Sequence, residues 1–79
     1  MRHLLTTADQ LGQILRSARR ERGLSQAQAG LRLGLSQSRL SELEQDAATV
    51  TVAQLLAMAS LYGLQLEVAT RASQAPTAW

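Results

Sequence analysis

The sequence predicts an all-α fold, a bundle of four to five short helices that is followed by one short β-strand. Apolar residues recur at helical spacing through most of the first 62 residues, and helix-capping residues and glycines separate the segments. Only residues 64–69 change to the alternating pattern of a strand. The 79 residues form at most one domain, and a domain of this size buries only about 60% of its unfolded surface.

The helix starts are predicted from their capping residues. A hydroxyl residue followed three positions later by Gln forms a capping box, in which each side chain accepts a hydrogen bond from the other residue's backbone N–H. Three such pairs occur, Thr7 with Gln10, Ser25 with Gln28 and Thr51 with Gln54, and Ser36 is a fourth cap without a box. They predict helices from 7 to near 21, 25 to about 33, 36 to about 45 and 51 to about 62.

The fourth predicted helix and residues 64–69 indicate whether the chain pairs with a second subunit. The fourth predicted helix is apolar on most faces, which predicts that it is enclosed on several sides. After Gly63, the apolar residues Leu64, Leu66 and Val68 alternate with Gln65, Glu67 and Ala69. Either this strand pairs with its copy in a second subunit, or the alternation is accidental in a frayed tail. Pairing is favoured, because a small core without cysteines needs support from a partner.

The stretch AGLRLGLSQSRLSELEQ, residues 29–45, allows two interpretations. Leu31, Leu33 and Leu35 alternate as in a strand, whereas Leu40 and Leu43 have helical spacing. The alternation is best explained as the end of one helix and the start of a corner, because Gly34 supplies the positive φ that a sharp turn requires. A short helix, a glycine turn and a second helix that opens with small polar residues form a helix-turn-helix pattern.

This pattern predicts which side chains face DNA, because the second helix of such a unit enters the major groove while the first crosses the phosphate backbone. Gln37 is the main candidate for a base contact, since a carboxamide pairs bidentately with adenine. The full candidate set is Gln26, Ser36, Gln37, Ser38, Arg39, Ser41, Glu42, Arg16 and Arg32. Each of these residues alone is more typical of a solvated helix face, and only the set in register favours DNA.

The charge distribution agrees with a polyanion partner. Residues 1–40 carry seven Arg against two acidic residues, a net charge of +5, whereas residues 41–79 carry a net charge of −3. We therefore expect the basic first half to contact phosphates, with Arg16, Arg32 and Arg39 as the candidate cations and Gln26 beside them at the start of the second helix.

The stretch LRSARRERGLSQAQAGLRLGLSQSRLSELEQ resembles the Xre/Cro helix-turn-helix family, and the resemblance covers roughly residues 11–62. It implies a lambda-repressor-like bundle and a structural ion pair between Arg19 and Glu44. Two positions depart from the family. Ala29 and Gly30 replace the usual Leu-Ala, at a cost of about 1 kcal/mol for a helical glycine unless a close helix crossing needs it. The loop at 46–50 lacks the usual glycine and proline.

Residues 40–68 and the tail that ends in Trp are similar to HipB-type antitoxins. That resemblance implies a homodimeric repressor that binds palindromic operator DNA and a HipA-type serine/threonine kinase toxin. The implied organisation is an N-terminal arm (1–6), a DNA-binding domain (7–63), a dimerisation strand (64–69) and a flexible tail (70–79). Trp79 is then the candidate anchor for a partner. The alternative is a stand-alone regulator of the same family without a toxin.

Other function classes are less favoured. The only histidine, His3, lies outside the predicted helices without a cysteine or a carboxylate pair beside it, so we expect neither an enzyme, nor a metal site, nor a cofactor. A helical module that binds only proteins is a further alternative. The longest apolar run is too short to span a bilayer, and the first residues do not resemble a secretory signal, so a cytoplasmic protein without membrane contact is expected.

Overall fold

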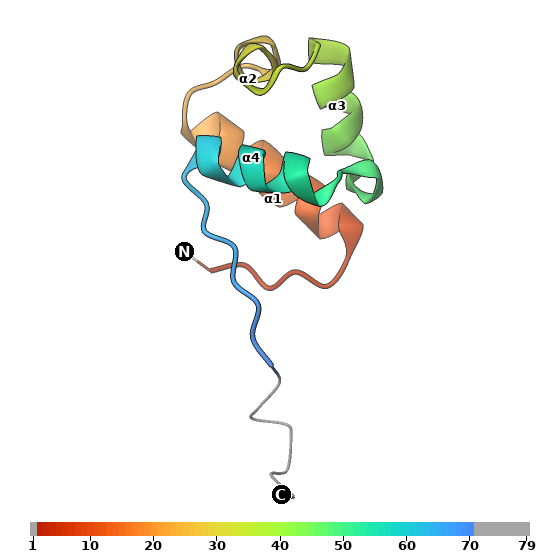
Figure 1. Ribbon diagram of the computed structural model, residues 1–79, viewed down its shortest axis with the longest axis vertical. Helices are drawn as coiled ribbons and strands as arrows, with labels where there is room; N and C mark the ends of the chain where they lie inside the picture. The colour runs from red at the N-terminus through yellow and green to blue at the C-terminus, as the bar shows by residue number, and fades with distance from the viewer. Residues whose placement is uncertain (1, 71–79) are drawn as a thin grey trace, which may run out of the picture.

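The computed structural model describes residues 2–70, and within them the chain forms four α-helices and one 3-10 turn. Their order is α1 (Ala8–Glu21), α2 (Gln26–Leu33), α3 (Gln37–Gln45), η1 (Ala47–Thr49) and α4 (Val52–Tyr62). α1 passes behind α4, and α2 and α3 lie above this pair in the view (Figure 1). α1 packs against α3, η1 and α4, while α2 packs against α3. The predicted helical bundle is therefore confirmed over these residues.

The helices begin where the capping residues predict. At the start of α1 the Thr7 hydroxyl accepts a hydrogen bond from the Gln10 N–H at 3.2 Å, and the Gln10 carboxamide accepts one from the Thr7 N–H at 3.2 Å. The same reciprocal pair of bonds forms at the starts of α2 and α4. Ser36 caps α3 alone, since Arg39 offers only its backbone N–H. Local hydrogen bonding thus determines all four helix starts.

The core lies where the helices meet. Its largest fully buried side chains are those of Leu15, Leu40, Leu43 and Met58, which come from α1, α3 and α4. A ring of partly buried leucines surrounds the main cluster and includes Leu64, which follows α4. The core is entirely aliphatic apart from Tyr62, so its stability comes from many small contacts.

Two helical glycines allow helices to approach closely. A Cβ on Gly30 would lie 2.6 Å from the carbonyl oxygen of Leu35, in the turn that connects α2 to α3. A Cβ on Gly12 would collide with the carbonyl oxygen of Glu44, where α1 crosses the end of α3. The departure from the family pattern at Gly30 therefore has a steric reason, because this turn leaves no space for a side chain.

The prediction that α4 is enclosed on several sides is wrong for the single chain. Met58, Ala59 and Tyr62 are buried, but Val52 is 72% exposed and Leu56 is 53% exposed. The physical reason is that, among the described elements, only α1 packs extensively against α4. The opposite face of this apolar helix is left open to solvent.

Residues 64–70 have no regular secondary structure, and no β-strand occurs in the part of the chain that the structure describes. Leu64 packs against the core of its own chain, whereas Leu66 and Val68 are exposed. The predicted strand needs a second strand to pair with, so its formation stays a prediction. The predicted tail beyond 70, with Trp79, lies outside the described residues. Between residues 2 and 70, no helix is long and apolar enough to cross a bilayer.

Candidate nucleic-acid interface

The corner between α2 and α3 is built from three backbone features. Gly34 ends α2 with φ at +72°, a left-handed conformation that glycine adopts without steric cost. The Leu35 N–H then donates to the Gly30 carbonyl at 2.8 Å. At the next residue the Ser36 hydroxyl accepts from the Arg39 N–H at 3.0 Å and starts α3. The turn is therefore short, and its hydrogen bonds determine the direction in which α3 leaves it.

Polar side chains line the outward face of α3. Ser36, Gln37 and Ser38 are exposed at its N-terminal end, and Ser41 is partly exposed one turn later. The opposite face carries Leu40 and Leu43, both fully buried. The two leucines anchor α3 to the core and leave its polar residues free to enter a groove.

Further polar residues extend this face toward the end of α3. Arg39 lies 3.7 Å from the Glu42 carboxylate in an exposed pair one helical turn apart, so part of its charge is offset locally. Gln45 is exposed and donates from its amide nitrogen to the Ser41 hydroxyl at 3.3 Å. Sequence reasoning missed Gln45, although its spacing of four residues from Ser41 was the available signal.

The residues predicted to contact phosphates divide into two groups. Arg32 is exposed on α2. Gln26 and Arg16 instead lie against Glu44. The Gln26 amide nitrogen donates to the Glu44 carboxylate at 3.1 Å, and Arg16 Nε lies 3.6 Å from the same oxygen. The structure therefore places Gln26 and Arg16 in an internal network as well as near the surface.

Glu44 is the centre of that network. Arg19 holds its carboxylate with two nitrogens, Nε at 2.6 Å and Nη2 at 3.1 Å, and donates from Nη1 to the Leu24 carbonyl at 2.8 Å. The Glu44 and Arg19 side chains are both buried, whereas Arg16 reaches the Glu44 carboxylate from a partly exposed position. The pair links α1, the start of α2 and the end of α3, and so holds the two helices of the corner against the rest of the domain.

The protonation of Glu44 follows from this geometry. Burial alone raises its pKa, because desolvation disfavours the charged carboxylate. The hydrogen bonds from Arg19 and Gln26, together with the charges of Arg19 and Arg16, outweigh the desolvation and leave the pKa below the ordinary value of 4.5. Glu44 is therefore ionised at neutral pH, as the ion pair requires.

Tyr62 is a second buried polar group near this network. Its hydroxyl is buried and has no hydrogen-bond partner among residues 2–70. Burial, with the negative charge of Glu44 as a smaller cause, raises the pKa of Tyr62 to about 12. Its backbone carbonyl accepts from Arg22 Nε at 3.0 Å, which ties the end of α1 to the end of α4. Neither role was visible in the sequence, since Tyr62 has only apolar helical spacing there.

The other predicted site residues lie away from α3. Leu66 and Val68 are exposed beyond α4, and Leu64 packs on the core. His3 is exposed in the segment before α1 and lines a shallow hollow beside that helix. Trp79 lies outside the described residues.

A comparison with known protein families matches a segment that contains the corner between α2 and α3. A family model described as a helix-turn-helix domain matches residues 10–72, which is 63 of the 79 residues. The matched segment includes all of α2, α3 and α4 and nearly all of α1. No curated protein matches the chain.

Proposed function

Because the chain belongs to the family of helix-turn-helix domains, we propose that it is a sequence-specific transcriptional repressor that binds palindromic operator DNA as a homodimer. One observation carries the proposal: α3 presents Gln37, Ser38 and Ser41 outward while Leu40 and Leu43 fix it to the core. A helix held in this way reads base edges in the major groove, and α2 crosses the backbone beside it.

Selection of binding sites from a random duplex library tests sequence specificity without knowledge of the operator. The purified chain is expected to enrich a palindrome whose half-sites lie about one helical turn apart. The selection is run at about 150 mM salt, where non-specific binding is weak. Failure to enrich any sequence under these conditions would contradict the repressor function.

Gln37 is the residue that we propose reads a base. Replacing Gln37 with Ala should cost roughly 1–3 kcal/mol of discrimination at one base position of the selected site. Gln13→Ala is the matched control, because Gln13 is exposed on α1, away from the corner. Binding isotherms on the selected site and on single-base variants give the discrimination. If Gln37→Ala weakens binding equally on specific and random DNA, Gln37 contacts phosphate instead.

The homodimer is proposed to pair residues 64–69 across a twofold axis. The side chains of Leu66 and Val68 support this proposal, because they alternate with polar residues and are 43% and 102% exposed. Leu66→Lys places a charge in the proposed sheet and should yield monomers by light scattering. A Leu66→Lys variant that stays dimeric would remove residues 64–69 from the interface.

The antitoxin role is a finer proposal and rests on the resemblance of residues 40–68 to HipB-type antitoxins. On this proposal the chain also binds a HipA-type serine/threonine kinase toxin, with Trp79 as a candidate anchor. Co-purification with the product of an adjacent kinase gene tests it, followed by an operator shift with and without that product. Absence of a kinase-sized reading frame beside this one would favour the stand-alone regulator.

A further inference from the structure

One face of α4 is exposed and uncharged. Val52 and Leu56 are 72% and 53% exposed, and Ala53, Ala57 and Ser60 lie exposed beside them. The sequence of α4, VAQLLAMASLY, contains no charged residue. α1, α2 and α3 each carry Arg, so α4 is the one helix among the described residues whose outer surface offers only apolar and small polar groups. Such a face is typical of a surface that another protein covers.

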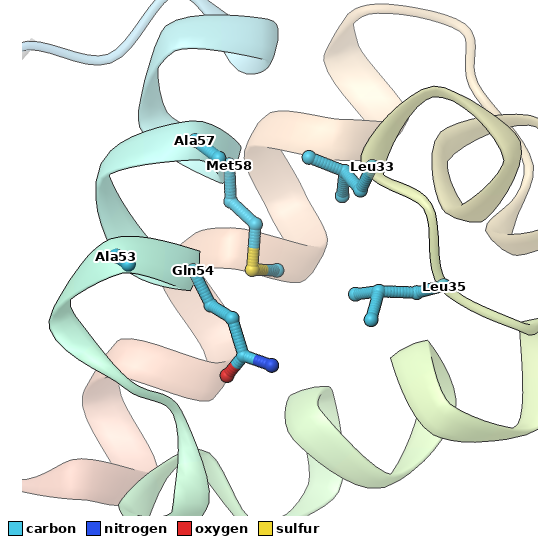
Figure 2. Close-up of a pocket in the computed structure, with 6 residues that line it drawn as sticks. All are labelled: Leu33, Leu35, Ala53, Gln54, Ala57 and Met58. Carbon is cyan, nitrogen blue, oxygen red and sulfur yellow. The ribbon is translucent and has the colours of Figure 1, made fainter.

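A hollow adjoins this face. An open apolar cleft of about 230 Å³ lies between α4 and the corner that connects α2 to α3. Figure 2 shows Leu33 and Leu35 on one side of the cleft, with Met58 and Gln54 of α4 pointing toward them and Ala53 and Ala57 beside these two. The projecting leucine of α4 and the hollow thus belong to neighbouring sides of one helix.

We propose that a second copy of this chain covers the α4 face, with Leu56 of each copy packed over Ala53 and Ala57 of the other at the rim of the cleft. A surface that carries both a projection and a hollow is self-complementary, because a twofold axis sets each against the other. The absence of charge on α4 also favours self-association, since a twofold axis would otherwise bring each charge near its own copy.

The other occupants fit less well. DNA requires cations, and α4 has none. A charged peptide would find no partner charge on this helix.

The area that a stable dimer must bury also favours a second copy on α4. Two paired strands are marginal in water by themselves, and a stable interface buries about 800 Å² on each partner. Residues 64–69 follow α4 directly and would supply only one short strand to the proposed pairing, so the α4 face would add area to that interface.

The proposed contact would also brace the DNA-binding corner. Leu33 and Leu35 lie on either side of Gly34, so a second copy at this cleft packs beside the turn that sets the direction of α3. Dimerisation and the placement of the recognition helix are then coupled through the same two leucines. This inference rests on the proposed homodimer and extends its interface from the strand to α4.

The test is the oligomeric state of Leu56→Glu, measured by sedimentation equilibrium. Dimerisation is expected to weaken at least about 100-fold, because each copy would place a carboxylate in an apolar contact near its twin. Leu31→Glu is the matched control: Leu31 is 84% exposed on α2 and does not line the cleft beside α4, so its substitution should leave dimerisation unchanged. A Leu56→Glu variant as dimeric as the parent, or a parent that is monomeric throughout, would overturn the inference.

Mixing experiments guard against a trivial loss of folding. Leu56→Lys alone should also be monomeric, while an equimolar mixture of Leu56→Glu and Leu56→Lys should recover dimers, because opposite charges then meet across the axis. Failure to recover dimers from two folded variants would count against the α4 contact. If either variant unfolds, Leu56→Ala removes the projection without adding charge, and dimerisation at least tenfold weaker is expected; unchanged dimerisation would overturn the inference.

The outcome is separable from the proposed function. Sedimentation uses no DNA, so loss of the α4 contact leaves the selection of binding sites as an independent measurement. Dimers that survive Leu56→Glu but dissociate with Leu66→Lys would mean that the strand alone forms the interface. Failure to select any DNA sequence would leave the dimer intact and contradict only the repressor function.

Discussion

At the scale of single residues, Glu44 connects folding to the surface that we propose faces DNA. Its carboxylate is buried and shared by Arg19, Gln26 and Arg16, so one side chain fixes residues on both sides of the corner. Removing one partner of a buried pair leaves the other charge without compensation, which costs far more than the intact pair contributes. Loss of the Glu44 carboxylate is therefore expected to destabilise the domain strongly.

Glu44→Gln tests this role. We expect a loss of about 3–5 kcal/mol in the free energy of unfolding, because Arg19 would stay buried without a counter-charge. Glu42→Gln is the control: its carboxylate is 67% exposed and 3.7 Å from Arg39, so a change below about 1 kcal/mol is expected. Urea unfolding measures both. Equal losses in the free energy of unfolding for the two variants would mean that the buried Glu44 pair contributes no more to stability than the exposed Glu42 pair.

The same carboxylate predicts a dependence on pH. The pKa of Glu44 is lower in the folded chain than its ordinary value of 4.5, so ionised Glu44 stabilises the fold above that pH. The contribution is lost as the pH falls below 4.5 and the unfolded chain takes up the proton first. Urea titrations between neutral and acidic pH should show this loss in the parent chain and a smaller loss in Glu44→Gln.

Tyr62 predicts a loss of stability at high pH, whereas Glu44 predicts one at low pH. Its buried hydroxyl has no partner within residues 2–70, so Tyr62→Phe should leave stability unchanged or raise it by about 1 kcal/mol. Because its folded pKa is raised to about 12, the parent chain should lose stability as the pH rises from 10 toward 12, by about 1.4 kcal/mol per unit. Tyr62→Phe should lack that loss. Tyr62 is the only tyrosine, so its absorbance reports the titration directly.

At the scale of elements, the predictable features are those that depend on neighbouring residues. Thr7 and Gln10 are three residues apart, so their capping box forms within one turn and does not depend on the rest of the fold. The exposure of Leu56 on α4 was not predictable, because the sequence shows an apolar helix but not how many helices cover it. The close approach at Gly12 likewise depends on how α1 crosses α3, which no local pattern encodes.

Some features of the candidate site can likewise be predicted from neighbouring residues, whereas others depend on contacts between distant parts of the chain. The spacing of Leu40 and Leu43 predicts that both side chains face inward, and the polarity of Gln37 predicts an exposed side chain; the structure shows them so. The pairing of Arg19 with Glu44 spans 25 residues and came only from family resemblance. The hydrogen bond from Gln26 to Glu44 was not foreseen at all, since a residue at the start of a helix has the same pattern whether it turns inward or outward.

Gly30 shows an element-scale conflict between propensity and packing. Helix propensity alone predicts that Gly30→Ala stabilises α2 by about 1 kcal/mol. We expect the reverse, because the new Cβ would lie 2.6 Å from the Leu35 carbonyl and would push the turn away from α2. Urea unfolding should show a net loss of about 1–3 kcal/mol. Increased stability would mean that the turn shifts without cost, and selected-site binding would show whether α3 moves with it.

At the scale of the whole molecule, a small core and an open apolar face on α4 are the features that the proposed homodimer would explain. The chain has no cysteine to form a disulfide, and its core is a single aliphatic cluster with one tyrosine. Domains of this size bury too little surface for a large margin of stability. Leu56 and Leu66 are exposed in the single chain, and the proposed dimer would bury both side chains and so raise the stability of the fold.

Thermal unfolding at different concentrations therefore becomes the decisive measurement at this scale. Where folding is coupled to dimerisation, each tenfold rise in concentration adds about 1.4 kcal/mol to the stability of the dimer. Because two chains share this gain, a hundredfold range should raise the midpoint of the parent chain by roughly 5–10 °C. Leu66→Lys and Leu56→Glu should each melt at a midpoint that does not change with concentration. A parent chain with a constant midpoint over that range would show that the α1–α4 bundle is stable as a monomer, so its open α4 face would need a different explanation.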